Sequence, residues 1–246
     1  MLKDPNFYIA LGTLLALVLS QVPPLRLLLR RARLTVLPFR RIVFYHSVGN
    51  ANCNLFLLLE NRGGRRVTVN GIAFELSAGG KNVMTLPAQG YWTDFEAKVE
   101  YPLTRFYLEP GQTWAHTIHC FEELNREDER RWRDCVDSIR KDIFGQIQAD
   151  QAAGITAAPT KVAEEANVAK AMKFFQDHFR YEVAEYVLTI RVECSPASAS
   201  SPSTHRFTLF ESDVAAMRRQ TERFKYGDGI YFTGSNQESF VSVRLQ

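Results

Sequence analysis

The residue types best suited to chemistry gather in one short segment, His116-Thr-Ile-His119-Cys120-Phe-Glu122-Glu123. Imidazole, thiolate and carboxylate groups are the usual protein ligands of zinc and similar metals. The segment alternates like a β-strand, however, and strand residues three apart point to opposite faces. No second cluster with metal-site spacing completes the set. A metal-dependent enzyme using His116, His119 and Cys120 is therefore only a secondary hypothesis, and we expect no cofactor.

Common catalytic motifs are missing from the sequence, which has no G-x-S-x-G, no phosphate-binding loop and no H-E-x-x-H. Gly63-Gly64, between Arg62 and Arg65, is typical of a glycine turn and not of a nucleotide cradle. Three further histidines are isolated along the chain: His46, His178 and His205. We therefore expect a non-enzymatic protein.

Positive charge is concentrated near the N-terminus. Residues 1–41 carry seven basic side chains and one acidic one, a net charge of +6, so the rest of the chain carries −3 of the overall +3. A nucleic-acid-binding domain would be expected to carry a strong positive excess of its own. This distribution argues against nucleic acid as a partner.

An uncharged, mostly apolar segment from Pro5 to Leu25 predicts a transmembrane anchor within residues 1–25. About 20 helical residues cross a hydrocarbon layer of roughly 30 Å. Pro23 and Pro24 would end the helix near the interface. A cleaved signal peptide is the main alternative, but the segment lacks a basic leader and a small-x-small cleavage site.

The basic segment that follows, residues 26–40, is predicted to lie next to the membrane. Arginines directly after an apolar segment resist translocation, so we expect a single-pass protein with its soluble domain in the cytoplasm. Apolar residues also recur at helical spacing from Leu25 to Ala32, so a helix here could rest among anionic headgroups. The simpler interpretation, which we favour, is that the arginines are only a topology signal. Residues 5–33 are the expected lipid contact, and the interface residues are Arg26, Arg30, Arg31 and Arg33.

From residue 41 to 246 the pattern predicts a mainly β domain. Short apolar or alternating runs separated by turn residues cover Ile42–His46, Cys53–Glu60, Arg66–Leu76, Asn82–Leu86, Leu103–Leu108 and Thr113–His119. Asn70-Gly71 is either a hairpin turn or a bulge. With the turn Leu108-Glu-Pro-Gly-Gln112 leading into the last run, the architecture resembles an antiparallel immunoglobulin-like sandwich over about 140 residues.

Helical patterns interrupt and then follow these strands. A helical hairpin is expected at about residues 125–180, with Asn125 as N-cap, Trp132 and Ile139 buried on one helix, and Met172 and Phe175 buried on the other. A further helix at about 212–225 carries the charged residues Arg218, Arg219 and Arg223, a candidate contact for a partner or membrane, although such a run is more often a solvated face.

Strand patterns resume towards the C-terminus. Alternating residues from Tyr186 to Cys194 predict one long strand, which should form a hairpin with 206–210. Two more short strands are expected at 229–232 and 239–245. In an immunoglobulin topology Cys53 and Cys194 would lie on the order of 25 Å apart, too far for a disulfide, so we expect all four cysteines to be reduced.

These observations favour a membrane-anchored, non-enzymatic interaction or assembly module that binds a partner protein through its β-sandwich, and that could form oligomers. One alternative is a membrane effector whose domain senses a small molecule and drives oligomerisation. The other is the metal-dependent enzyme described above.

Overall fold

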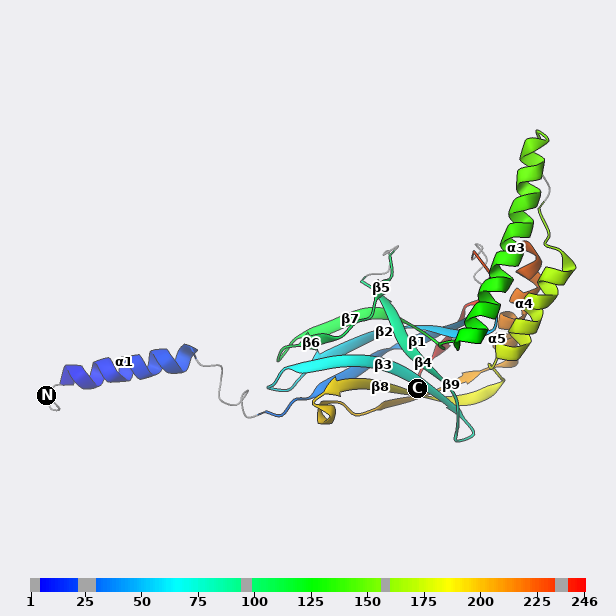
Figure 1. The fold of residues 1–246 in the computed structure, drawn as a ribbon. Coiled ribbons are helices and arrows are strands. Elements are labelled where there is room, and N and C mark those ends of the chain that lie inside the picture. The colour runs from blue at the N-terminus through cyan, green and yellow to red at the C-terminus, as the bar shows by residue number, and fades with distance from the viewer. Residues whose placement is uncertain (1–4, 22–29, 94–98, 156–159, 233–238) are drawn as a thin grey trace.

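A computed structural model describes residues 5–21, 30–93, 99–155, 160–232 and 239–246 (Figure 1). Helix α1, Pro5–Gln21, is the first element. Its large apolar side chains between Phe7 and Leu17 are exposed. The predicted transmembrane anchor is not supported, because no helix in the described ranges combines the length and the apolarity needed to cross a bilayer.

The rest of the chain is mainly antiparallel β-sheet with helices. The strands are β1 Leu34–Ser47, β2 Asn50–Asn61, β3 Val67–Ala78, β4 Lys81–Trp92, β5 Tyr101–Pro102, β6 Phe106–Leu108, β7 Thr113–Phe121, β8 Ala184–Ser195, β9 Ser203–Leu209 and β10 Val241–Arg244. They pair in the order β10-β1-β2-β7-β4-β3-β8-β9, with β5 beside β4 and β6 beside β3.

The sheet is continuous and nearly closed, which differs from the two separate sheets of an immunoglobulin-like sandwich. The first half of β4 pairs with β3 and its second half pairs with β7, so β4 joins the two halves. At the other seam, Arg206 and Gln246 exchange main-chain hydrogen bonds of 3.1 and 2.9 Å. The result is a barrel-like sandwich.

Much of the barrel core is built by alternation along the strands, since successive side chains point to opposite faces. The predicted inward face of β8 is confirmed: Tyr186, Leu188, Ile190, Val192 and Cys194 are all buried. Gly71 sits at a register shift between β3 and β8, so Asn70-Gly71 forms a bulge and not a hairpin. All four cysteines are free and buried.

The predicted boundary between the juxtamembrane segment and the β domain, at residue 41, falls inside β1. Residues 34–40 of the predicted juxtamembrane segment are strand, and the side chains of Ala32 and Leu34 are buried in the barrel core. Residues 22–29 lie outside the described ranges. Arg30 to Arg33 are not helical, so an amphipathic helix does not extend through this part of the segment.

Helices gather at the end of the barrel where β1 finishes (Figure 1). They are α3 Arg126–Ala152, α4 Glu165–His178 and α5 Glu211–Arg219, followed by the 3-10 helix η2 Gln220–Tyr226; a second 3-10 helix, η1 Ala197–Ala199, lies in the β8–β9 connection. The Asn125 side chain accepts hydrogen bonds from the backbone nitrogens of Glu127 and Asp128 at 3.0 and 2.9 Å, as the N-cap prediction requires.

A second apolar core lies among these helices and contains Ile139, Phe174, Phe175 and Phe224. Trp132 and Met172, which were expected to be buried, are only half-buried at its margin. The strand expected at 229–232 is absent from this described segment, where a single bridge joins Asp228 to Phe232.

Candidate anion-binding cleft

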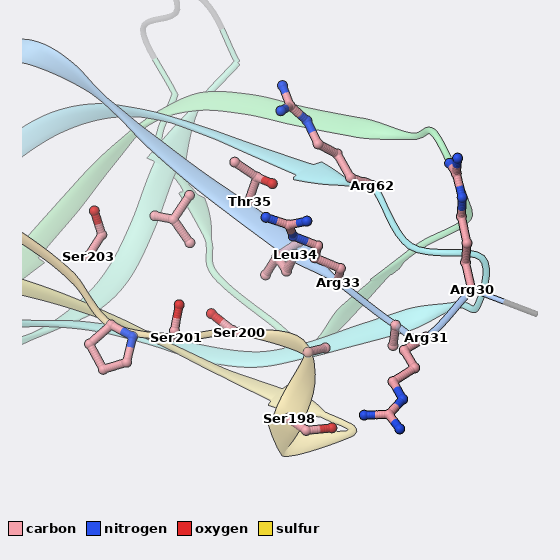
Figure 2. Close-up of a pocket in the computed structure, with 14 residues that line it drawn as sticks. Arg30, Arg31, Arg33, Leu34, Thr35, Arg62, Ser198, Ser200, Ser201 and Ser203 are labelled. Carbon is pink, nitrogen blue, oxygen red and sulfur yellow. The ribbon is translucent and has the colours of Figure 1, made fainter.

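An open cleft of about 910 Å³ lies where the chain enters β1. Figure 2 shows the start of β1 along one side and the serine-rich β8–β9 connection along the other. Four arginines line it: Arg30, Arg31, Arg33 and Arg62. The first three were predicted as interface residues from their nearness to α1. The fourth, Arg62, comes from the turn after β2.

Backbone hydrogen bonds hold the two arginine segments together. The nitrogens of Arg62 and Gly63 donate to the carbonyl of Arg33 at 2.9 and 3.2 Å, and the nitrogen of Gly64 donates to the carbonyl of Arg31 at 3.3 Å. Buried Asn61 shapes the turn, because its Oδ1 accepts from the nitrogen of Gly63 at 3.0 Å. The guanidinium groups therefore project from a fixed frame.

Glycine is required at position 63 by this close approach. A Cβ atom there would collide with the backbone nitrogen of Arg33 and the backbone carbonyl of Arg31. The interpretation of Gly63-Gly64 as a turn agrees with this geometry. The turn contributes to the cleft through packing against the arginine backbone.

The positive charge of the cleft is largely uncompensated. No carboxylate lines it, and within the described ranges none comes within 4.0 Å of Arg30, Arg31 or Arg33. Arg62 pairs with Glu60 at 2.7 Å, and both side chains are partly exposed. Figure 2 shows the side chains of Arg30 and Arg31 extending in opposite directions, so the excess positive charge is spread along the cleft and favours an anion through its overall field.

Hydroxyl groups supply the opposite wall, from Ser198, Ser200, Ser201 and Ser203. The Oγ of Ser200 is buried and has no hydrogen-bond partner in the described structure. The Oγ of Ser203 and Nε2 of His205 lie 2.8 Å apart. Guanidinium forks and hydroxyls together suit the oxygens of a phosphate group, because both can donate hydrogen bonds to it.

The other arginines singled out in the sequence lie elsewhere. Arg26 is outside the described residues. Arg218 stacks over the ring of Phe179 at 5.3 Å, and Arg223 forms an ion pair with Asp228. With exposed Arg219, these side chains lie on α5 and η2 at the helical end of the barrel, separated from the cleft by the length of β1.

The structure does not bring His116, His119 and Cys120 together. Cys120 faces the barrel core beside Cys53, its cross-strand neighbour, and burial raises the pKa of the Cys120 thiol well above its ordinary value. His116 packs against Trp114, with ring centroids 4.7 Å apart. His119 lies on the outer face. Within the described ranges no group of three potential metal-ligating residues is found.

Sequence reasoning missed Arg62 and the serines of the cleft. Arg62 is about 30 positions from Arg33, and the serine segment is far more distant still. The only local signals were the two glycines after Arg62 and the density of serine between residues 195 and 204. Neither indicates where the segments meet.

No protein family, characterised protein or solved structure is found to match this chain.

Proposed function

We propose that this protein is a non-enzymatic, membrane-associated binding module that recognises anionic lipid headgroups at the arginine cleft. The observation that carries the proposal is the position of the cleft in the chain. Arg30 follows the end of α1 by nine residues, which span at most about 30 Å when fully extended. An exposed apolar helix and an uncompensated basic cleft are thus tethered within reach of one bilayer surface.

In this proposal α1 embeds its apolar side chains in lipid, and the arginines bind headgroup phosphates. Basic residues near an anionic bilayer contribute about 1 kcal/mol each. Anionic lipids are concentrated in the cytoplasmic leaflet, so binding through these arginines favours the cytoplasmic side for the domain. A partner protein is proposed to bind elsewhere on the barrel, which remains accessible when the cleft faces the membrane.

Flotation of the full chain with lipid vesicles tests the proposal. The chain should bind neutral phosphatidylcholine vesicles through α1 and bind vesicles with phosphatidylserine more tightly. Arg31→Gln with Arg33→Gln should remove most of the added affinity for anionic vesicles, on the order of 30-fold, and leave binding to neutral vesicles unchanged.

A matched control is available at the other end of the barrel. Arg218→Gln with Arg219→Gln removes the same charge and should keep the preference for anionic vesicles. If the control pair loses the preference and the cleft pair keeps it, the proposal is wrong. Inorganic phosphate added as a competitor separates lipid from free anion: displacement by low millimolar phosphate would show that the cleft takes free phosphate.

A further inference from the structure

The outer wall of the barrel beside the cleft carries apolar side chains on β1. Leu34 is buried in the barrel core and Val36 packs against it, so Leu37 points to the outer face of the sheet. Leu37 is 45% exposed and Phe39 is 56% exposed. Leu58, which lies opposite Leu37 on β2, is also apolar and only half-buried. A sheet face that meets water normally carries polar residues, so these side chains mark a contact surface.

A register shift in β1 explains why Phe39 is exposed together with the two residues after it. Two successive pairs of β1 and β2 enclose three residues of β1, Phe39 to Arg41, but only one residue of β2. Such a bulge redirects side chains that regular alternation would turn into the core. All three side chains are exposed, so an aromatic ring and two guanidinium groups emerge from one short stretch of the wall.

A second strand brings another arginine to the same place. Arg41 lies directly opposite Arg244 of β10, and both side chains are exposed. The Nε of Arg41 donates to the Oγ of Ser242 at 3.0 Å, and its Nη2 donates to the carbonyl of Ser242 at 3.1 Å. Among the described residues no carboxylate lies within 4.0 Å of Arg40, Arg41 or Arg244. Like charges directly opposite each other destabilise a sheet, so this arrangement favours an anion from outside the chain.

We call these residues the outer patch: Leu37, Phe39, Arg40, Arg41 and Arg244. Apolar side chains beside unpaired cations suit a bilayer surface, where rings enter the boundary of headgroups and acyl chains and guanidinium groups bind phosphates. The position of the patch also favours a bilayer as its partner. It lies on the strand that the chain enters after α1, and Phe39 follows the first residue of β1 by five positions, roughly 17 Å.

We propose that the barrel lies against an anionic bilayer through the outer patch, with Phe39 and Leu37 inserted between lipids and Arg40, Arg41 and Arg244 bound to phosphate oxygens. This inference rests on the proposed function, because the partner is the same membrane, but it names a separate surface. Two contacts along β1 fix the orientation of the barrel. In the strand order β3 and β4 lie opposite β1 and β10, so their wall faces away from the bilayer and stays accessible to a partner protein.

Tryptophan fluorescence of the full chain on lipid vesicles tests the insertion. Phe39→Trp places a reporter in the outer patch, and the wild-type chain, measured alongside, gives the background of its three native tryptophans. On anionic vesicles the added emission should shift to shorter wavelength and be quenched by lipids brominated near the headgroup. Phe210→Trp is the matched control, since Phe210 is 63% exposed at the helical end of the barrel. Its added emission should show neither change.

Two results would overturn the proposal. Equal quenching of both variants would show that the reporter does not distinguish the outer patch from the rest of the surface. Absence of quenching in Phe39→Trp would leave the exposed arginines to an acidic protein partner. The headgroup proposal fails separately. A chain that prefers anionic vesicles without quenching at position 39 keeps the cleft as the lipid site, whereas quenching without that preference supports insertion and contradicts the headgroup site.

Arginine variants test the part that charge plays in the insertion. Arg41→Gln with Arg244→Gln, in the Phe39→Trp background, should reduce the quenching on anionic vesicles and reverse part of the wavelength shift. Arg66→Gln with Arg191→Gln removes the same charge from side chains that already pair with Glu109 and Glu75, and should leave both signals unchanged. An equal loss with both pairs of variants would reflect net charge alone and would refute the outer patch as a specific contact.

Discussion

Acidification should destabilise the folded domain through one buried histidine. His46 is 3% exposed and is held in one protonation state by two contacts. Its Nε2 lies 2.9 Å from the carbonyl of Met217 and donates to it, while Nδ1 accepts from the nitrogen of Gly49 at 3.1 Å. Burial lowers the pKa of His46 from 6.5 to about 4. A second proton would place an N–H at Nδ1 against the N–H of Gly49.

The sign and size of the effect follow from this shift. Below pH 6.5 the unfolded chain takes up a proton at His46, but the folded chain does so only near pH 4. The unfolded state therefore gains stability as the pH falls through this window. Between pH 7 and pH 5 the loss in free energy of unfolding should be about 2 kcal/mol, and by pH 4 it should be about 3 kcal/mol.

Urea denaturation at pH 7, 6, 5 and 4 measures the effect. Because carboxylates also titrate, the informative quantity is the difference between the wild-type chain and His46→Gln. Glutamine can accept from Gly49 and donate to Met217 without titrating. The variant should be less stable than the wild-type chain at pH 7. This difference in the free energy of unfolding should narrow by about 3 kcal/mol at pH 4. A difference in the free energy of unfolding that stays constant with pH would refute the reasoning.

Three further outcomes are expected. Ile139→Ala should lower the free energy of unfolding by about 2 to 5 kcal/mol in urea denaturation, because Ile139 is fully buried, whereas exposed Phe144→Ala should cost less than about 1 kcal/mol. Gly63→Ala should cost about 1 to 3 kcal/mol and weaken binding to anionic vesicles, because the new Cβ displaces the arginine backbone; thermal melting and flotation measure both effects. A chain that begins at residue 30 should fold, whereas one that begins at residue 41 should not, because the latter loses half of β1; circular dichroism distinguishes them.

Local features of this fold were predictable from the sequence. The inward face of β8 follows from alternation, and the start of α3 follows from the capping chemistry of Asn125. The burial of Val214, Met217 and Phe224 follows from helical spacing. Each of these depends on neighbours a few residues apart.

The pairing of strands that are far apart in the sequence was not predictable. The role of β4 as a corner between β3 and β7 depends on which strands meet, and periodicity carries no information on strand order. Trp132 has the right spacing for the second core but packs only at its margin and is half-buried. His46 is isolated from other histidines in the sequence, and its distant partner, the carbonyl of Met217, is brought to it only by the fold.

In the candidate site, too, the local part was predictable from the sequence and the long-range part was not. Arg31 and Arg33 were identified from their density beside an apolar segment, but Arg62 and Ser200 join them only through the turn after β2 and the β8–β9 connection. His116, His119 and Cys120 lie close together in the sequence, which suggested a metal site. The strand geometry separates them.

Hydrogen–deuterium exchange of the full chain in lipid nanodiscs tests the central claim most directly, since it locates the headgroup contact. Anionic nanodiscs, compared with neutral ones, should slow amide exchange in two segments that are distant in sequence, residues 30–36 and 198–203, which face each other across the cleft. Exchange in α5 should be the same in both lipids. Added protection confined to α5 and η2, or no difference between the lipids, would contradict the assignment of the cleft as the headgroup site.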